Sequence, residues 1–280
     1  MSERDVDVKA AVREHYASVV RNSGSGCGCG TAAVSCCGPT SVPTQISREV
    51  GYSDGDLAAV PEGSNLGLGC GNPLAFAALE PGNVVVDLGS GAGIDCFLAA
   101  KKVGEAGRVI GVDMTPEMLD RARSNAADDG YANIEFRLGE IENLPVADRT
   151  ADMVISNCVI NLSTDKPRVF REALRILKPG GKLMVSDLVL ERPLPESVRR
   201  SVEAYAGCIA GAVLRDDYLA AIRDAGFTDV EVLAESGYDI GASNPDESEL
   251  ALVNDADVTP EDARAAAAAV KSVKVSAVKP

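Results

Sequence analysis

The chain has 280 residues, and 42 acidic side chains against 27 Lys and Arg give it a formal net charge of −15. This balance disfavours nucleic acid and anionic membranes as partners. No apolar stretch reaches the roughly 20 residues of a membrane span, and the acidic start does not resemble a signal peptide. We therefore expect a cytoplasmic protein, in which 8 cysteines indicate metal, metalloid or redox chemistry rather than disulfides.

The amino-terminal part combines a helix with a cysteine-rich loop. Residues 5–21 place apolar side chains at helical spacing and predict a helix. A glycine-rich stretch then carries Cys27, Cys29, Cys36 and Cys37. Four thiols are the ligand set of some structural zinc sites, but neither pair has the usual C-x₂₋₄-C spacing. Zinc binding is therefore the less favoured interpretation of this loop.

Residues 52–73 predict a mostly irregular segment that leads into the core and can fold over a ligand there. Within it, Cys70 stands between Gly69 and Gly71. Because this context is so poor in apolar side chains, an inert buried cysteine is less natural here than elsewhere in the chain.

A strand, a glycine turn and a helix organise the centre of the chain. Residues 84–88 form the apolar run typical of a buried parallel strand, and the turn Gly89-Ser90-Gly91-Ala92-Gly93 follows. Glycines allow close approach to a ligand, and the next helix offers free N–H groups. Ile94 replaces the third glycine of a dinucleotide fingerprint. With Asp87, this spacing resembles motif I of S-adenosylmethionine-dependent methyltransferases, whose cofactor has a cationic amino-acid end.

Strands and helices then alternate, as in an open parallel sheet. Strands are predicted at 108–113, 134–138, 151–156 and 182–190, with helices at 116–126 and 166–177 and a turn at 178–181. Asp113 ends the second strand about 20 residues after the glycine turn, where this fold binds ribose hydroxyls. Met114 is placed to pack on adenine. Asn157 and Cys158 end the fourth strand, at the edge of the sheet where ligands lie.

The carboxyl-terminal region interrupts this alternation and then resumes it. Residues 191–213 lie where methyltransferases, whose motif I the glycine turn resembles, commonly insert an element that covers the substrate. Cys208 in this region faces either the core or the substrate. A helix at 216–225, a strand at 230–233, an acidic loop at 236–258, a helix opened by Thr259 and Pro260, and a sheet-closing strand at 270–279 follow. Cys96, beside Phe97, is interpreted as a packed small hydrophobe.

Several stretches together resemble the arsenite S-adenosylmethionine methyltransferase family over nearly the whole chain. They are Ser35–Gly38, Asn65–Pro73, Val86–Asp95, Ser156–Leu162, Gly207–Gly211 and Ala277–Pro280. The resemblance implies an α/β, Rossmann-like class I methyltransferase fold, with a mostly parallel seven-stranded sheet and helices on both faces. It divides the chain into a Cys-rich segment covering the active site (1–73), a cofactor-binding core (74–190) and a substrate-covering region that completes the sheet (191–280).

The resemblance also implies roles for particular residues. Cys70, Cys158 and Cys208 would hold trivalent arsenic, and Cys36 or Cys37 would take part in redox cycling or product transfer; no role is assigned to Cys27 and Cys29. The turn at 139–145 resembles the part of the family that contacts adenine. The cofactor-binding residues would be Asp87, Gly89, Ser90, Gly91, Gly93, Asp113, Met114, Glu140, Ile141, Glu142 and Asn157.

The implied activity is methylation of arsenite, or of its thiol conjugates, in arsenic detoxification. Thioredoxin or glutathione would restore the thiols, and a monomer is expected. Arsenic bound by three soft thiolates keeps a lone pair and is a nucleophile toward a sulfonium methyl group. No general base is required, so catalysis would rest on proximity and alignment, aided by lowered thiol pKa values.

Two other functions remain as alternatives to arsenite methylation. The first is methylation of a small organic metabolite, with incidental cysteines, whose activity would survive loss of the thiols. The second is a thiol-rich metal-binding or sensing protein on a vestigial methyltransferase fold, which would not turn over the cofactor. The intact Asp87, Asp113 and glycine turn argue against this last function.

Overall fold

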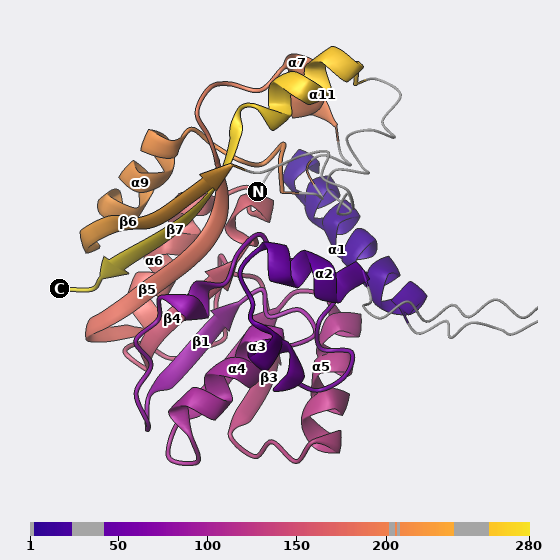
Figure 1. The fold of residues 1–280 in the computed structure, drawn as a ribbon. Coiled ribbons are helices and arrows are strands. Elements are labelled where there is room, and N and C mark those ends of the chain that lie inside the picture. The colour runs from indigo at the N-terminus through magenta and orange to yellow at the C-terminus, as the bar shows by residue number, and fades with distance from the viewer. Residues whose placement is uncertain (1–2, 24–41, 202–204, 206–207, 238–257) are drawn as a thin grey trace, which may run out of the picture.

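One seven-stranded sheet runs through the centre of the protein, as the computed structural model shows (Figure 1). The structure describes residues 3–23, 42–201, 205, 208–237 and 258–280. The strands are β1 (Val84–Leu88), β2 (Arg108–Asp113), β3 (Ile134–Leu138), β4 (Ala151–Asn157), β5 (Leu177–Leu190), β6 (Thr228–Gly237) and β7 (Val270–Val278). Their order across the sheet is β3-β2-β1-β4-β5-β7-β6.

The sheet is mixed but mostly parallel, which confirms the predicted class. Strands β3, β2, β1, β4 and β5 pair in parallel, whereas β7 is antiparallel to both of its neighbours, β5 and β6. The strand order reverses between β1 and β4, so the connections after these two strands leave the sheet in opposite directions. In open α/β sheets this switch point is where ligands bind.

Helices cover both faces of the sheet, because both faces of its central strands are apolar. On one face Val85 of β1 packs with side chains of α4 and α5, including Phe97 and Leu119. On the other, Val86 packs with α6 and α9, including Phe170. The helices are α1 (Glu3–Ser23), α2 (Val42–Glu49), α3 (Asp54–Ala58), α4 (Ile94–Val103), α5 (Pro116–Asp128), α6 (Lys166–Ile176), α7 (Glu196–Arg200), α9 (Arg215–Asp224) and α11 (Pro260–Ala267), with short 3₁₀ turns η1 (Pro73–Ala75) and η2 (Ile160–Leu162). Within the described ranges, no helix is both long and apolar enough to span a membrane.

A third hydrophobic core includes the carboxyl end of β5 and contains the thiols. It joins Val12 of α1, Val198 of α7 and Ala266 of α11 to Cys70, Cys158 and Cys208. In Figure 1, α7 and α11 lie together at the top of the molecule, with α1 next to them. Segments from both ends of the chain therefore enclose the three cysteines.

Most predicted elements are confirmed, and the differences have local causes. The segment 52–73 is less irregular than predicted, because Ser53 and Asp56 form a capping box that starts α3. The predicted turn at 178–181 lies inside β5, where the register of the pairing between β5 and β4 shifts. The edge strand β6 is longer than the predicted 230–233. The prediction was too short because the exposed polar residues of this strand hide its apolar alternation. Of the predicted loop at 236–258, residues 238–257 lie outside the described residues.

Candidate active site

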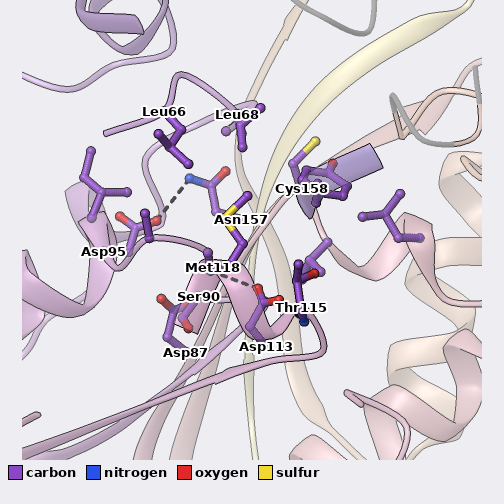
Figure 2. Close-up of a pocket in the computed structure, with 18 of the residues that line it drawn as sticks. Leu66, Leu68, Asp87, Ser90, Asp95, Asp113, Thr115, Met118, Asn157 and Cys158 are labelled. Carbon is purple, nitrogen blue, oxygen red and sulfur yellow. Dashed lines mark hydrogen bonds between the residues drawn. The ribbon is translucent and has the colours of Figure 1, made fainter. Parts of the chain in front are cut away.

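The glycine turn after β1 borders a cavity at the switch point of the sheet (Figure 2). Gly89 and Gly91 have φ angles of +67° and +53°, values that a side chain disfavours. A Cβ at Gly89 would also clash with the Val159 side chain. Gly91 donates its N–H to Asp113 Oδ2 at 2.9 Å. Asp113 thus ties the end of β2 to the turn, and its Oδ1 accepts from Thr115 N at 2.8 Å.

The cavity is lined by most of the cofactor-binding residues inferred from the sequence. Gly93 and Glu140 are the two outside its lining. Gly93 is the N-cap of α4 with a φ of +99°, and a Cβ there would lie 2.8 Å from Phe97. Glu140 accepts a hydrogen bond from Lys9 Nζ at 2.8 Å. In this structure Gly93 shapes the turn, and Glu140 fastens helix α1 over the cavity.

A hydrogen-bonded network missed in the sequence analysis lies at one end of this cavity. The Tyr52 hydroxyl donates to Asp95 Oδ1 at 2.8 Å, and Asn157 Nδ2 lies 3.1 Å from Asp95 Oδ2. Burial raises the pKa of the Asp95 carboxyl to about 6. The sequence signal was an acidic residue on the buried side of α4, beside Phe97, but acids in a first helical turn are also common as dipole partners.

Asn157 connects this network to the segment that carries Cys70. Its Nδ2 also donates to the Gly71 carbonyl at 2.8 Å, and a Cβ at Gly69 would lie 2.7 Å from the same nitrogen. The Cys70 carbonyl accepts from Ser272 Oγ of β7 at 2.9 Å. The two glycines therefore let the backbone around Cys70 pass directly over β4 and β5.

The three cysteines of the third core converge at the carboxyl end of β4. Sγ of Cys70, Sγ of Cys158 and a carboxylate oxygen of Asp187 all lie within 4.8 Å of one another. Cys208 Sγ donates to the Cys158 carbonyl at 2.8 Å. All three thiols are buried, and Cys158 also lines the cavity. Cys70 and Cys208, more than a hundred positions apart in the chain, thus share one site. Cys208 faces this cluster, whereas the sequence alone did not decide between the core and the substrate.

The backbone at two of these cysteines is strained. Cys158 and Cys208 have φ angles of +57° and +65°, and such left-handed conformations cost non-glycine residues of the order of 1–3 kcal/mol. Strain of this kind persists where the surroundings enforce it and clusters at functional sites. Here Cys158 N donates to the Ser186 carbonyl at 2.8 Å, which holds its thiol toward the cluster.

The pKa values of the Cys70 and Cys158 thiols are raised, contrary to the expectation that thiol pKa values would be lowered. Hydrogen bonds with Cys208 and Cys70, followed by burial, raise the pKa of Cys158 well above its usual value. Burial raises the pKa of Cys70. The sequence could not show this, because the shift arises from packing the thiols against one another. The free protein therefore holds Cys70 and Cys158 as neutral thiols.

Comparison with known proteins identifies the family. A methyltransferase domain model matches residues 79–226. The chain is 48% identical over 239 residues to the arsenite methyltransferase of Halobacterium salinarum, covering 83% of this chain and 60% of the relative. It is 39% identical to the arsenite methyltransferase of Aquipseudomonas alcaligenes, covering 80% and 63%. CrArsM, an arsenic(III) S-adenosylmethionine methyltransferase from Chlamydomonas reinhardtii, matches in structure with a TM-score of 0.61 and 36% identity, over 84% of this chain and 73% of that one.

The chain belongs to the arsenite S-adenosylmethionine methyltransferase family. The resemblance recognised in the sequence and the predicted fold class are thereby confirmed. S-adenosylmethionine is the cofactor of this methyltransferase domain. The chain spans 60% and 63% of the two curated relatives.

The residues of the cavity fit this cofactor. Ser90 Oγ and Asn157 Oδ1 are buried without a hydrogen-bond partner, although buried polar atoms are nearly always paired. Three acids, the buried Asp87 and Asp95 and the half-buried Asp113, also border the cavity (Figure 2). A cationic ligand with hydroxyl groups supplies both the missing donors and the positive charge. Cys27, Cys29, Cys36 and Cys37 lie outside the described residues.

Proposed function

We propose that this chain transfers methyl groups from S-adenosylmethionine to trivalent arsenic held by Cys70, Cys158 and Cys208. The observation that carries the proposal is the convergence of these thiols beside the cofactor cavity, with Cys158 bordering both. The names and similarity of the relatives support the same activity. Arsenic(III) is a soft centre, and three thiolates are the donors it prefers.

Loading the site requires no base among the side chains. Each neutral thiol condenses with one As–OH group of arsenous acid, so that an As–S bond forms and one water molecule leaves. Raised thiol pKa values are therefore compatible with loading, because the protons depart in water. Burial of the thiols also excludes bulk water from the loaded arsenic.

Alignment is the main catalytic contribution that we assign to the protein. S-adenosylmethionine, when bound, supplies an electrophilic methyl group on a sulfonium ion. Asp113 would bind the ribose, and the network of Tyr52, Asp95 and Asn157 would receive the cationic amino-acid end. Because Asn157 bonds the backbone beside Cys70, cofactor binding and the arsenic site are positioned by the same amide. Such orientation accelerates transfer without proton removal.

The chemistry of the reaction indicates which reductant and which cellular compartment it needs. Methylation raises the formal oxidation state of arsenic by two, and a thiol reductant such as thioredoxin or glutathione would supply the two electrons that return it to the trivalent state. Thiols that must stay reduced favour the cytoplasm. The formal charge of −15 gives no support to a nucleic-acid partner.

The proposal is tested by replacing each cysteine of the cluster with serine, one at a time. Each variant is expected to lose methylation of arsenite while keeping cofactor affinity and thermal stability, because a trithiolate site needs every sulfur. Arsenic speciation in excess thiol measures the product, and calorimetry measures cofactor binding. Cys96→Ser is the matched control, since Cys96 is equally buried but bonds Asp87 at 3.3 Å. Retained activity in a cluster variant would remove that cysteine from the site, and no methylation of arsenite by the unchanged chain would favour an organic substrate.

A further inference from the structure

A carboxylate lies beside the thiol cluster and has no part in the mechanism above. Asp187 of β5 is fully buried, and its carboxylate is within 4.8 Å of the sulfurs of both Cys70 and Cys158. The lining of the cofactor cavity includes Cys158 but not Asp187. Asp187 thus approaches the thiols from the interior of the protein rather than from the cofactor cavity.

The hydrogen bonds of Asp187 leave one of its oxygens with free capacity. Oδ1 accepts from Asn161 Nδ2 and from Leu188 N, both at 2.9 Å. Oδ2 accepts from the Tyr218 hydroxyl at 3.0 Å. Since each carboxylate oxygen has two lone pairs, Oδ2 retains a position for one further ligand.

This carboxylate also lacks a direct counter-ion in the part of the chain that the structure describes. Lys166 is the cation whose charge acts on it, but the Lys166 ammonium donates to the carbonyls of Asn161 and Ser163, at 3.3 and 3.1 Å. A buried carboxylate without a paired cation is costly. A bound metal ion is one group that removes this cost.

The combination of sulfur and oxygen donors distinguishes two classes of ligand. Trivalent arsenic takes three sulfurs and keeps a lone pair, so it has no use for a carboxylate. Zinc and similar thiophilic divalent ions prefer four tetrahedral donors drawn from cysteine, histidine and carboxylate. Cys70, Cys158 and Asp187 supply three of these. Cys208, whose Sγ donates a hydrogen bond to the Cys158 carbonyl at 2.8 Å, lies next to them and is the fourth.

We propose that Cys70, Cys158, Cys208 and Asp187 form a binding site for a thiophilic divalent cation, Zn²⁺ or Cd²⁺, and that this ion competes with trivalent arsenic for the thiols. The positive charges of Lys166 and Lys274, which act on Asp187 and Cys70, offset the excess negative charge of four anionic ligands. Occupation by the divalent ion blocks methylation, because no sulfur remains for arsenic. The binding itself does not rest on the proposed activity.

The test is a titration of the reduced full-length chain with cadmium chloride. Cys27, Cys29, Cys36 and Cys37 are replaced by serine, so that the amino-terminal thiols do not bind the ion. The ultraviolet thiolate-to-cadmium absorption band reports binding, and X-ray absorption of the zinc form reports its ligands. We expect one ion per chain with mixed sulfur and oxygen neighbours, displaced by excess arsenite.

Asp187→Asn is the decisive variant, because asparagine keeps an acceptor for Asn161 and Leu188 while losing the anionic ligand. It should weaken cadmium binding at least about tenfold and leave arsenite binding unchanged. Asp152→Asn is the matched control, since Asp152 also accepts from a backbone N–H and a side chain, at the other end of β4.

Three outcomes contradict the inference: no cadmium binding, all-sulfur coordination, or equal cadmium affinity in Asp187→Asn. Failure of the methylation proposal gives a different result. In that case the protein binds cadmium through Asp187 but does not methylate arsenite.

Discussion

Cys70 reaches the thiol cluster because the residues on both sides of it have no side chain. A Cβ at Gly71 would clash with the Ser186 side chain of β5, and one at Gly69 would approach the Asn157 amide to 2.7 Å. The Gly-Cys-Gly sequence is therefore a packing requirement at this point. It lets a loop lie against the strand ends closely enough for Cys70 Sγ to meet Ser186 O at 3.7 Å.

Gly71→Ala tests this requirement. The added methyl group overpacks the contact with Ser186, and we expect a loss of about 1–3 kcal/mol in the free energy of unfolding. The second change Ser186→Gly removes the opposing atoms, so the double variant should lose less than the sum of the two single changes. Denaturant unfolding of all four proteins measures this coupling. Additive losses would show that Ser186 is not the obstacle.

One buried ammonium group helps to hold helix α1 over the cavity. Lys9 Nζ lies 2.8 Å from Glu140 and 3.0 Å from Glu142. The side chains of Lys9 and Glu142 are only 8% and 7% exposed, so solvent screens this contact weakly. Exposed ion pairs, such as those of Arg21 near the other end of α1, contribute about 0–1 kcal/mol.

Lys9→Met is expected to loosen α1 without unfolding the sheet. Loss of charged hydrogen bonds of about 1.5–3 kcal/mol should raise amide hydrogen exchange in α1 about tenfold or more, while β1 and β4 stay protected. Arg21→Met removes a charge from the same helix at an exposed position and serves as the control. Equal exchange in the two variants would contradict the assigned role of Lys9.

The central elements could be predicted from sequence, whereas contacts between them could not. Strands β1, β2 and β3 begin and end where predicted, because continuous apolar runs and glycine turns are local signals. The sequence of α2 contains no such run or turn, and this helix was not predicted. Asp95 and Asp187 were missed as site residues, although an acid within the apolar run of β5 was a usable clue. Their roles depend on neighbours contributed by distant segments, such as Tyr52 and Cys70.

At the scale of the whole molecule, the fold gathers three acids around one cavity of an already acidic chain. Burial, with the nearby Asp95 charge, raises the pKa of Asp87 well above its usual value, and burial raises that of Asp113. For Asp95 the pKa rises from 3.8 to about 6. Between these two values the folded state holds more protons than the unfolded state. Ionising Asp95 therefore reduces folding stability as the pH rises through this window.

Binding of a cationic cofactor makes ionisation of Asp95 favourable, so that the affinity for the cofactor depends on pH. If Asp95 receives the cationic amino-acid end of S-adenosylmethionine, its ionised form binds better. Cofactor affinity should then rise with pH, by about tenfold between roughly pH 5 and pH 7, as the ionised fraction grows around a pKa of about 6. Calorimetric titrations across this range measure it.

Asp95→Asn is the variant that isolates this group from the other acids of the cavity. Asparagine keeps an acceptor for the Tyr52 hydroxyl but carries no charge at any pH. The affinity of this variant should be lower at neutral pH, and the rise centred near pH 6 should disappear. Asp54→Asn, a control on α3 whose side chain is 78% exposed, should keep the rise. If Asp95→Asn retains the full pH dependence, another acid of the cavity receives the cationic end of the cofactor.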